Sequence, residues 1–144
     1  MKILFSFFSL FYIASIFILA GDPLAESLSK YNPFSLLHVP LYGILTLLLV
    51  LSMVPIRRNP KDPSTRRGDD STELGVRERA SLGLRLSIAG GIALAVGILD
   101  EVHQLYVPGR DASVTDVGLD LVGIAVVLVL FFGLFKTGVL NLKE

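Results

Sequence analysis

The stretch ILDEVHQLYVPGRDASVTDVGLDLVG, residues 98–123, lies between two long apolar runs and carries a dense group of ionisable side chains. Near its middle, Pro108 and Gly109 favour a tight turn. The residues on either side continue the apolar runs, whose length is that of membrane-spanning helices. We therefore expect two antiparallel helices joined by a short turn, a geometry that brings the acidic residues of both helices to the same depth.

Four segments have the length and composition of transmembrane helices, at about 3–20, 34–54, 82–103 and 114–135. The chain is 52% hydrophobic and has a mean hydropathy of +0.66, above the usual apolar share of a soluble domain. Spanning β-strands would alternate in polarity over about 10 residues, which these continuous runs do not. The sequence predicts an all-α polytopic membrane protein, a single domain over residues 1–144 with four transmembrane helices in an antiparallel bundle.

The distribution of basic residues predicts the orientation. The connecting segment 55–81 holds seven of the 13 Lys and Arg residues, whereas the other two connections hold Lys30 and Arg110 alone. The positive-inside rule therefore places this segment and both termini in the cytoplasm. Its Pro, Ser and Asp residues predict a flexible basic cytoplasmic loop. Segment 3–20 has an alternative interpretation as a signal peptide, although its apolar run exceeds the usual length of about 7–15 residues.

Composition excludes several classes of function. The 13 basic and 13 acidic residues balance, and no basic stripe interleaved with aromatic residues indicates a nucleic-acid surface. The sequence contains no cysteine, which excludes disulfides, thiolate metal sites and cysteine nucleophiles. The lipid bilayer is the expected partner, and the oligomeric state is left open.

The predicted topology places the ionisable residues of the membrane segments at the outer face, where the second and fourth segments begin and the third ends. Residues three, four or seven positions apart share one face of a helix. Three groups with this spacing are expected to face the interior of the bundle: His38 and Tyr42; Asp100, His103 and Gln104; and Asp116, Asp120 and Gly123.

Two adjacent carboxylates, Asp100 and Glu101, end the third segment, where the helix dipole disfavours negative charge. A carboxylate within a bilayer costs at least about 2.5 kcal/mol on insertion scales, so these acids need partners. Arg110 is the expected one, through a bidentate guanidinium pair, and His38 and His103 are others.

Plainer roles stay open for single residues. Asp116 could cap the fourth helix, together with Ser113 or Thr115. Arg110 could hold the turn against the acids and do nothing more. For the cluster as a whole, a functional site is the favoured interpretation, because adjacent carboxylates at a helix C-terminus repel each other and are poorly explained by structure alone.

The residues DEVHQLYVPGRDASVTDVGLDLVG resemble the signature of the VanZ-like family of small bacterial membrane proteins. That family has an Asp-Glu pair, a Gln three residues after the Glu, Pro-Gly-Arg, a Ser, an Asp and, four residues later, an Asn that precedes a Gly. The corresponding residues here are Asp100, Glu101, Gln104, Pro108, Gly109, Arg110, Ser113, Asp116, Asp120 and Gly123. The earlier LLHVPLYGILTLLL is similar to the family's His-x-x-x-Tyr block, with His38 and Tyr42 at the matching positions. The resemblance covers roughly residues 30–135.

Two positions depart from the family pattern. Asp120 stands where the family has an amide, and Ser35, Leu36 and Leu37 precede His38 where the family commonly has Asp-Lys. If His38 pairs with an acid, that acid must come from elsewhere in the chain. The resemblance implies four helices, a multi-pass location in the bacterial inner (plasma) membrane and an association with resistance to glycopeptide antibiotics such as teicoplanin. It implies no established reaction.

Three functions compete for the predicted site: an enzyme acting on a lipid-linked or headgroup substrate, a protein that binds such a ligand or an antibiotic without chemistry, and a structural polar network. The candidate catalytic residues are Glu101, Asp100 and His38. The candidate substrate-binding residues are Arg110, Gln104, Tyr42, Asp116, Asp120, Ser113 and His103. Carboxylates and histidine could hold a divalent metal, but no motif of known metal-binding geometry is present, so we assign no metal ligand from the sequence.

Overall fold

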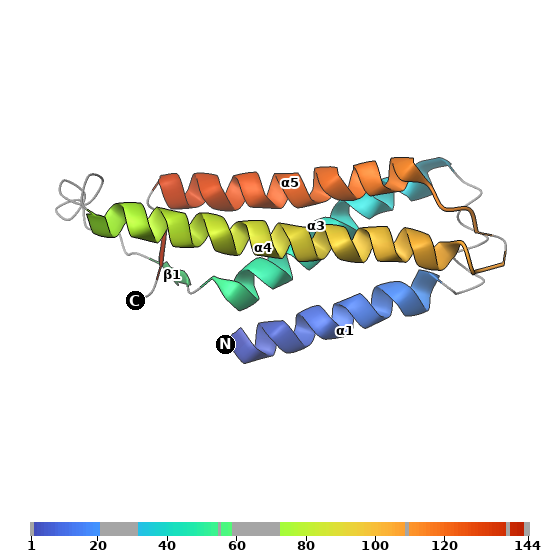
Figure 1. Cartoon of the computed structure of the whole chain (residues 1–144), viewed down its shortest axis with the longest axis horizontal. Helices are drawn as coiled ribbons and strands as arrows, with labels where there is room; N and C mark the ends of the chain where they lie inside the picture. Colours follow the sequence, from blue (N-terminus) through green and yellow to red (C-terminus); the bar gives the residue numbers. More distant parts are fainter. Residues whose placement is uncertain are drawn as a thin grey trace.

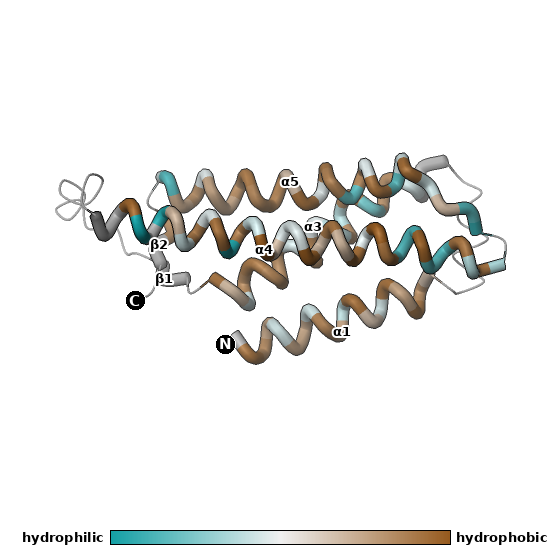
Figure 2. The backbone as a smooth tube through the Cα atoms, viewed as in Figure 1, coloured by the Kyte–Doolittle hydropathy of each residue, from teal (hydrophilic) through white to brown (hydrophobic). Residues whose placement is uncertain are grey.

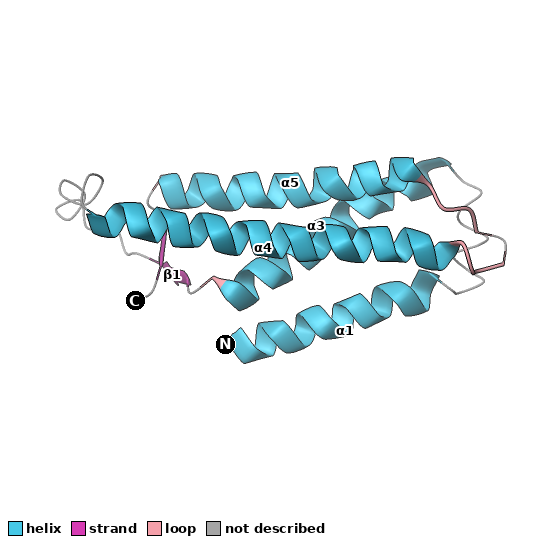
Figure 3. Cartoon of the chain, in the orientation of Figure 1, coloured by secondary structure: helices cyan, strands magenta, loops and turns pink. Residues whose placement is uncertain are grey.

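The computed structural model describes residues 2–20, 32–54, 56–58, 73–108, 110–137 and 139–142. Its elements are drawn in Figures 1 and 3. They are α1 (Lys2–Ala20), the 3-10 helix η1 (Asn32–Leu37), α3 (His38–Met53), β1 (Ile56–Arg58), α4 (Glu73–Gln104), α5 (Val114–Lys136) and β2 (Leu140–Leu142). The prediction of four helices long and apolar enough to cross a membrane is confirmed.

The outward faces of the long helices are apolar. Phe7 on α1, Leu99 on α4 and Val129 on α5 are 66%, 56% and 70% exposed. Helices that are hydrophobic on all sides belong in a core or in a membrane, and hydrophobic residues run along much of the length of each helix (Figure 2). The chain is a multi-pass membrane protein whose exposed apolar side chains suit contact with lipid.

Successive long helices run in opposite directions along the long axis of the molecule (Figure 1). α3 contacts each of the other three long helices. The Tyr12 hydroxyl on α1 donates a hydrogen bond to the Leu41 carbonyl oxygen on α3 at 3.2 Å. As a result, the end of α4, the beginning of α5 and the beginning of α3 meet at one end of the molecule, and the two short strands lie toward the other (Figure 1).

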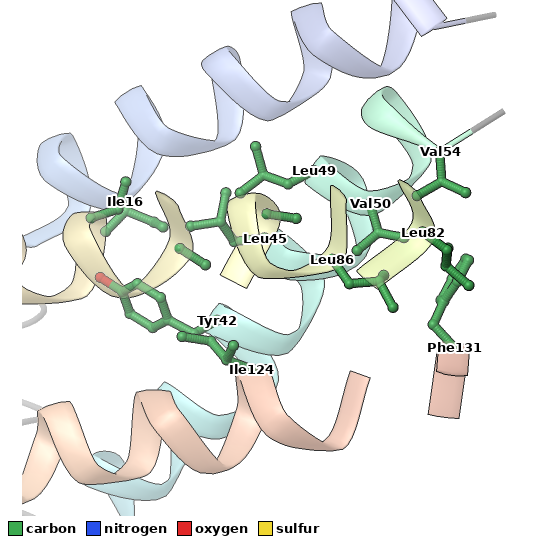
Figure 4. Packing of buried hydrophobic residues seen from close by; sticks show 13 residues of the cluster. Ile16, Tyr42, Leu45, Leu49, Val50, Val54, Leu82, Leu86, Ile124 and Phe131 are labelled. Atoms are coloured by element: carbon green, nitrogen blue, oxygen red, sulfur yellow. The ribbon is translucent and has the colours of Figure 1, made fainter. Parts of the chain in front are cut away.

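The apolar core joins all four long helices. Figure 4 shows Ile16 from α1, Leu45 from α3, Leu86 from α4 and Ile124 from α5 meeting in one cluster. Between helices that cross a bilayer, van der Waals packing stabilises such a cluster more than the hydrophobic effect that drives soluble folding.

Small residues allow α3 and α5 to approach closely. A Cβ atom placed on Gly123 would lie 2.1 Å from the Val39 carbonyl oxygen and 3.0 Å from the Gly43 backbone nitrogen. Glycine is therefore the residue that this crossing requires, as is common where membrane helices pack. The close crossing brings the first turns of α3 and α5 together and so positions the side chains of the candidate site.

An arginine joins α4 to the C-terminal end of α3. Arg85 Nη1 donates a hydrogen bond of 2.6 Å to the Met53 carbonyl oxygen. The last carbonyl groups of a helix have no partner within it, and a cation there also complements the helix dipole. This contact stabilises the end of the molecule opposite the candidate site.

The predicted bounds of the loop, 55–81, are wrong at both ends, where the structure has a strand and the beginning of a helix. α4 begins at Glu73, and β1 pairs antiparallel with β2, with Arg57 opposite Asn141. The residues that follow Glu73 are mostly strong helix formers. A helix can therefore extend beyond the lipid, because its backbone hydrogen bonds are kept while its charged side chains enter water. Strands of three residues are too short to show a periodic pattern. The remainder of the loop, 59–72, lies outside the described residues.

Candidate functional site

The predicted site residues lie at the end of the molecule where α4 ends and α5 begins (Figure 1). α3 contributes His38 and Tyr42, α4 contributes three polar side chains in its last turn, and α5 contributes Asp116 and Asp120. Most of these polar residues are buried: His38, Asp100, Glu101, Gln104 and Asp120 are each at most 8% exposed. Such burial in a membrane protein requires that each group find a partner.

His38 is held between two acids of α5. Its Nδ1 forms a buried hydrogen bond of 2.9 Å with Asp120 Oδ1, and its Nε2 lies 3.8 Å from Asp116 Oδ2. An ionised carboxylate only accepts hydrogen bonds, so with Asp120 ionised Nδ1 carries the proton and Nε2 of the neutral ring carries the lone pair. Asp120, which stands where the VanZ-like pattern has an amide, is thus the acid that pairs with His38.

Asp116 has a second partner that the sequence did not indicate. The Ser35 hydroxyl in η1 donates a hydrogen bond to Asp116 Oδ1. Ser35 precedes His38 by three residues, and the continuous turn from η1 into α3 presents both side chains to α5. The three-residue spacing between Ser35 and His38, which puts both on one helical face, could have indicated that Ser35 belongs to the site.

The Gln104 amide joins Arg110 to the two adjacent acids. Gln104 Nε2 donates to Asp100 Oδ2 at 3.1 Å and to Glu101 Oε1 at 3.3 Å, and its Oε1 accepts a hydrogen bond of 3.1 Å from Arg110 Nη2. Glu101 Oε2 also accepts a hydrogen bond of 2.7 Å from the Ser113 backbone N–H. The turn between α4 and α5 is therefore tied back to the last turn of α4.

Ser113 contributes its backbone rather than its side chain. It occupies the N-cap position of α5 with extended backbone dihedrals, and its side chain forms no capping hydrogen bond. Asp116, in the first turn, directs its carboxylate to Ser35 and His38. The interpretation of the Ser113 side chain as a helix cap is therefore wrong. The Asp116 carboxylate finds its partners in η1 and α3 rather than at the end of its own helix.

Three buried oxygen atoms at this site have no hydrogen-bond partner among the described residues: Tyr42 OH, Asp100 Oδ1 and Asp120 Oδ2. Asp120 and Tyr42 are fully buried, and both lie beside Gly97, whose added Cβ would be 2.6 Å from Asp120 Oδ2 and 3.3 Å from Tyr42 Cε1. The Tyr42 ring also stacks on the His38 ring, with 6.1 Å between centroids. Unsatisfied buried polar atoms are rare in folded proteins and call for an explanation.

His103 makes its described contact with another helix, α1. Its ring contacts Phe17 of α1 edge to face, with 5.7 Å between ring centroids. Each helical residue turns about 100°, so Gln104 lies between Asp100 and Glu101 on the helix circumference while His103 lies about 100° from Gln104. The described contact of His103 is with α1, so its grouping with Asp100 and Gln104 stays a prediction.

The composition of the cluster favours binding a cation. It contains four carboxylates, one imidazole and one guanidinium, which belong to Asp100, Glu101, Asp116, Asp120, His38 and Arg110. One ligand atom from each of His38, Glu101 and Asp116 lies within 4.8 Å of the other two. Carboxylate oxygen and imidazole nitrogen are ligands of divalent metals.

Comparison with known proteins does not identify the chain: no family model, no curated protein and no solved structure matches it.

Proposed function

We propose that the chain is a bacterial inner-membrane protein whose site lies at the outer face and acts on the polar part of a lipid-linked or cell-envelope substrate. The hydrogen bond between His38 and Asp120 is the observation that carries the proposal. A carboxylate at one imidazole nitrogen orients the ring and leaves the other nitrogen for a proton, a ligand or a metal. The resemblance to the VanZ-like family supports the same residues and links them to glycopeptide resistance.

The unsatisfied atoms favour a functional site over a purely structural network. A network that only joins helices gains most when every member has a partner. Here three fully or almost fully buried side chains each leave an oxygen without one among the described residues. In this site, the chemistry is performed by Glu101, Asp100 and His38. The polar group of the substrate is bound by Arg110, Gln104 and the two acids of α5, Asp116 and Asp120.

The proposed orientation places both termini in the cytoplasm and the candidate site at the outer face, following the basic residues of the 55–81 segment. The test is cysteine labelling, which the absence of native cysteine makes unambiguous. Single cysteines in place of Ser64 and Ala112 should react with a membrane-impermeant maleimide from opposite sides of the membrane. Labelling of both from the same side would overturn the orientation.

Growth under teicoplanin tests the function. The chain expressed in a glycopeptide-sensitive bacterium should raise the inhibitory concentration, and Glu101→Gln should abolish the gain at equal protein level because it removes the charge while keeping the side-chain size. Asp111→Asn is the matched control, since Asp111 is an exposed acid of the same turn, and it should keep the gain. Equal values for wild type and empty vector would refute the link to glycopeptides, and equal values for wild type and Glu101→Gln would refute the site.

Binding without chemistry is the second candidate, and the engagement of Glu101 favours it. Both carboxylate oxygens of Glu101 accept hydrogen bonds, so this carboxylate is already held in place as a polar binding group. Native mass spectrometry of the protein extracted from membranes separates the candidates. An enzyme carrying Glu101→Gln should retain its lipid-linked ligand, whereas a binding protein carrying it should lose the ligand.

A further inference from the structure

We infer that His38, Glu101 and Asp116 bind one divalent transition-metal ion, of the Zn²⁺ or Mn²⁺ class. These residues come from three elements, since His38 begins α3, Glu101 lies in the last turn of α4 and Asp116 in the first turn of α5. Their ligand atoms lie within 4.8 Å of one another. The inference deepens the proposed function by naming the cofactor of that site, although the binding itself can be measured without any substrate.

The spacing suits a metal between the three groups. Zn²⁺ lies about 2.0–2.2 Å from nitrogen and oxygen ligands, so two ligand atoms of one tetrahedral ion stand about 3.3–3.6 Å apart. The 3.8 Å between His38 Nε2 and Asp116 Oδ2 is only a few tenths of an ångström longer than this and is too long for a hydrogen bond. The three ligand atoms lie within 4.8 Å of one another, so side-chain movements of about 1 Å bring them to coordination distance of one ion.

Buried groups without partners supply a second, separate observation. His38 is 8% exposed, and no hydrogen bond among the described residues closes the 3.8 Å gap between its Nε2 and Asp116 Oδ2. Asp100, which precedes Glu101 near the end of α4, is 3% exposed and leaves Oδ1 buried with no partner among the described residues. A cation at this point would meet both the lone pair of the imidazole and the field of the nearby carboxylate.

The charge balance points the same way. Four carboxylates at the end of the molecule outnumber the guanidinium and the one imidazole that lie with them. Buried like charges repel strongly where the dielectric constant is low, and they are retained when paired or when they coordinate a metal. A bound divalent ion adds two positive charges in the middle of this group and is the largest local charge that such a site can hold.

The surrounding hydrogen bonds orient the ligands as metal sites require. Asp120 holds His38 Nδ1, which leaves Nε2 for the ion, and carboxylate–histidine–metal arrangements of this kind are the rule. The Ser35 hydroxyl holds Asp116 Oδ1, and the Ser113 backbone N–H holds Glu101 Oε2. Each carboxylate oxygen keeps further lone-pair capacity for a metal. Asp120 is thus a positioning residue rather than a ligand.

The donor set selects the ion class and its role. The imidazole nitrogen suits Zn²⁺ and the two carboxylates also suit Mn²⁺, whereas Mg²⁺ and Ca²⁺ are usually held by oxygen ligands alone. Three protein ligands leave coordination positions for water or substrate, as in catalytic rather than structural sites. The ion would also let this acidic site accept an anionic headgroup that four carboxylates would otherwise repel.

Metal binding by the full chain in detergent tests the inference. After chelator treatment, equilibrium dialysis against Zn²⁺ or Mn²⁺ should give one ion per chain, and His38→Gln and Asp116→Asn should each weaken binding at least about 10-fold. The matched controls are His103→Gln, the other of the two histidines, and Asp111→Asn. Both controls should bind as wild type does. No bound ion above the detergent blank, or equal affinities for His38→Gln and His103→Gln, would overturn the inference.

A measurement on the unaltered protein avoids the risk that a variant fails to fold. In chain labelled with ¹⁵N-histidine, adding Zn²⁺ should shift the ring resonances of His38 and leave those of His103 in place. Unchanged resonances for both rings would overturn the metal site while leaving the proposed function to the teicoplanin assay. The two experiments can also give different answers. If Zn²⁺ shifts the His38 ring resonances but Glu101→Gln leaves teicoplanin resistance unchanged, the metal site is established and the proposed function is refuted.

Discussion

Replacing Gly123 by alanine should force α3 and α5 apart. The added Cβ would lie 2.1 Å from the Val39 carbonyl oxygen and 3.0 Å from the Gly43 backbone nitrogen. Overpacking typically costs about 1–3 kcal/mol, and the upper value applies here because backbone atoms cannot rotate away as a side chain would. A loss of about 3 kcal/mol is about two powers of ten in the unfolding equilibrium constant and lowers the melting temperature by about 10 °C.

Thermal unfolding followed by circular dichroism in detergent measures this effect, and the same helix provides the control. A Cβ on Gly118 or Gly133 would meet nothing within 4 Å, and alanine favours a helix over glycine by about 1 kcal/mol. Gly118→Ala should therefore melt at or slightly above the wild-type temperature. If Gly123→Ala melted within about 2 °C of Gly118→Ala, the close crossing of α3 and α5 would be refuted as the feature that holds the site together.

Three further substitutions test other contacts. Asp120→Asn keeps size but removes the charge that holds the His38 ring, so Zn²⁺ affinity should fall about 10-fold to 100-fold in dialysis while the melting temperature stays within a few degrees. Gly97→Ala places a methyl group 2.6 Å from Asp120 Oδ2, so the same assay should show weaker binding; unchanged affinity would mean that the carboxylate can move without cost. Arg85→Gln removes the guanidinium bond to the C-terminal end of α3 and should destabilise the protein by about 1.5 kcal/mol, with metal binding unchanged.

Hydropathy was sufficient to predict the four long helices, because a run of about 20 apolar residues has few stable alternatives in a bilayer. It was not sufficient for the start of α4, which lies at Glu73 in polar sequence. Helix propensity there is strong, yet a charged segment rich in turn-forming residues resembles a loop in composition. The β1–β2 pair was missed because it joins residues near 57 and 141, a contact that no local pattern encodes.

The candidate site was predicted in outline but not in its pairings. Helical spacing placed Asp116 and Asp120 on one face and put Gln104 beside the acids of α4. The choice of Asp120 as the partner of His38 depends on two residues 82 positions apart. It follows from the crossing of α3 and α5 at Gly123 rather than from any property of either residue alone. For the same reason the sequence did not reveal Ser35 as a partner of Asp116.

By itself, the sequence determined which segments are apolar enough to enter the membrane. It also determined that the four acids, the histidine and the arginine of the candidate site gather at one end. Both follow from local properties of the chain, namely apolar length and helical periodicity. The tertiary structure decided which of these side chains contact one another. The rotation of α4 directs His103 to Phe17 and leaves Glu101 in the cluster. The close approach of α3 and α5 turns a set of acidic side chains into a carboxylate–imidazole pair beside two further carboxylates.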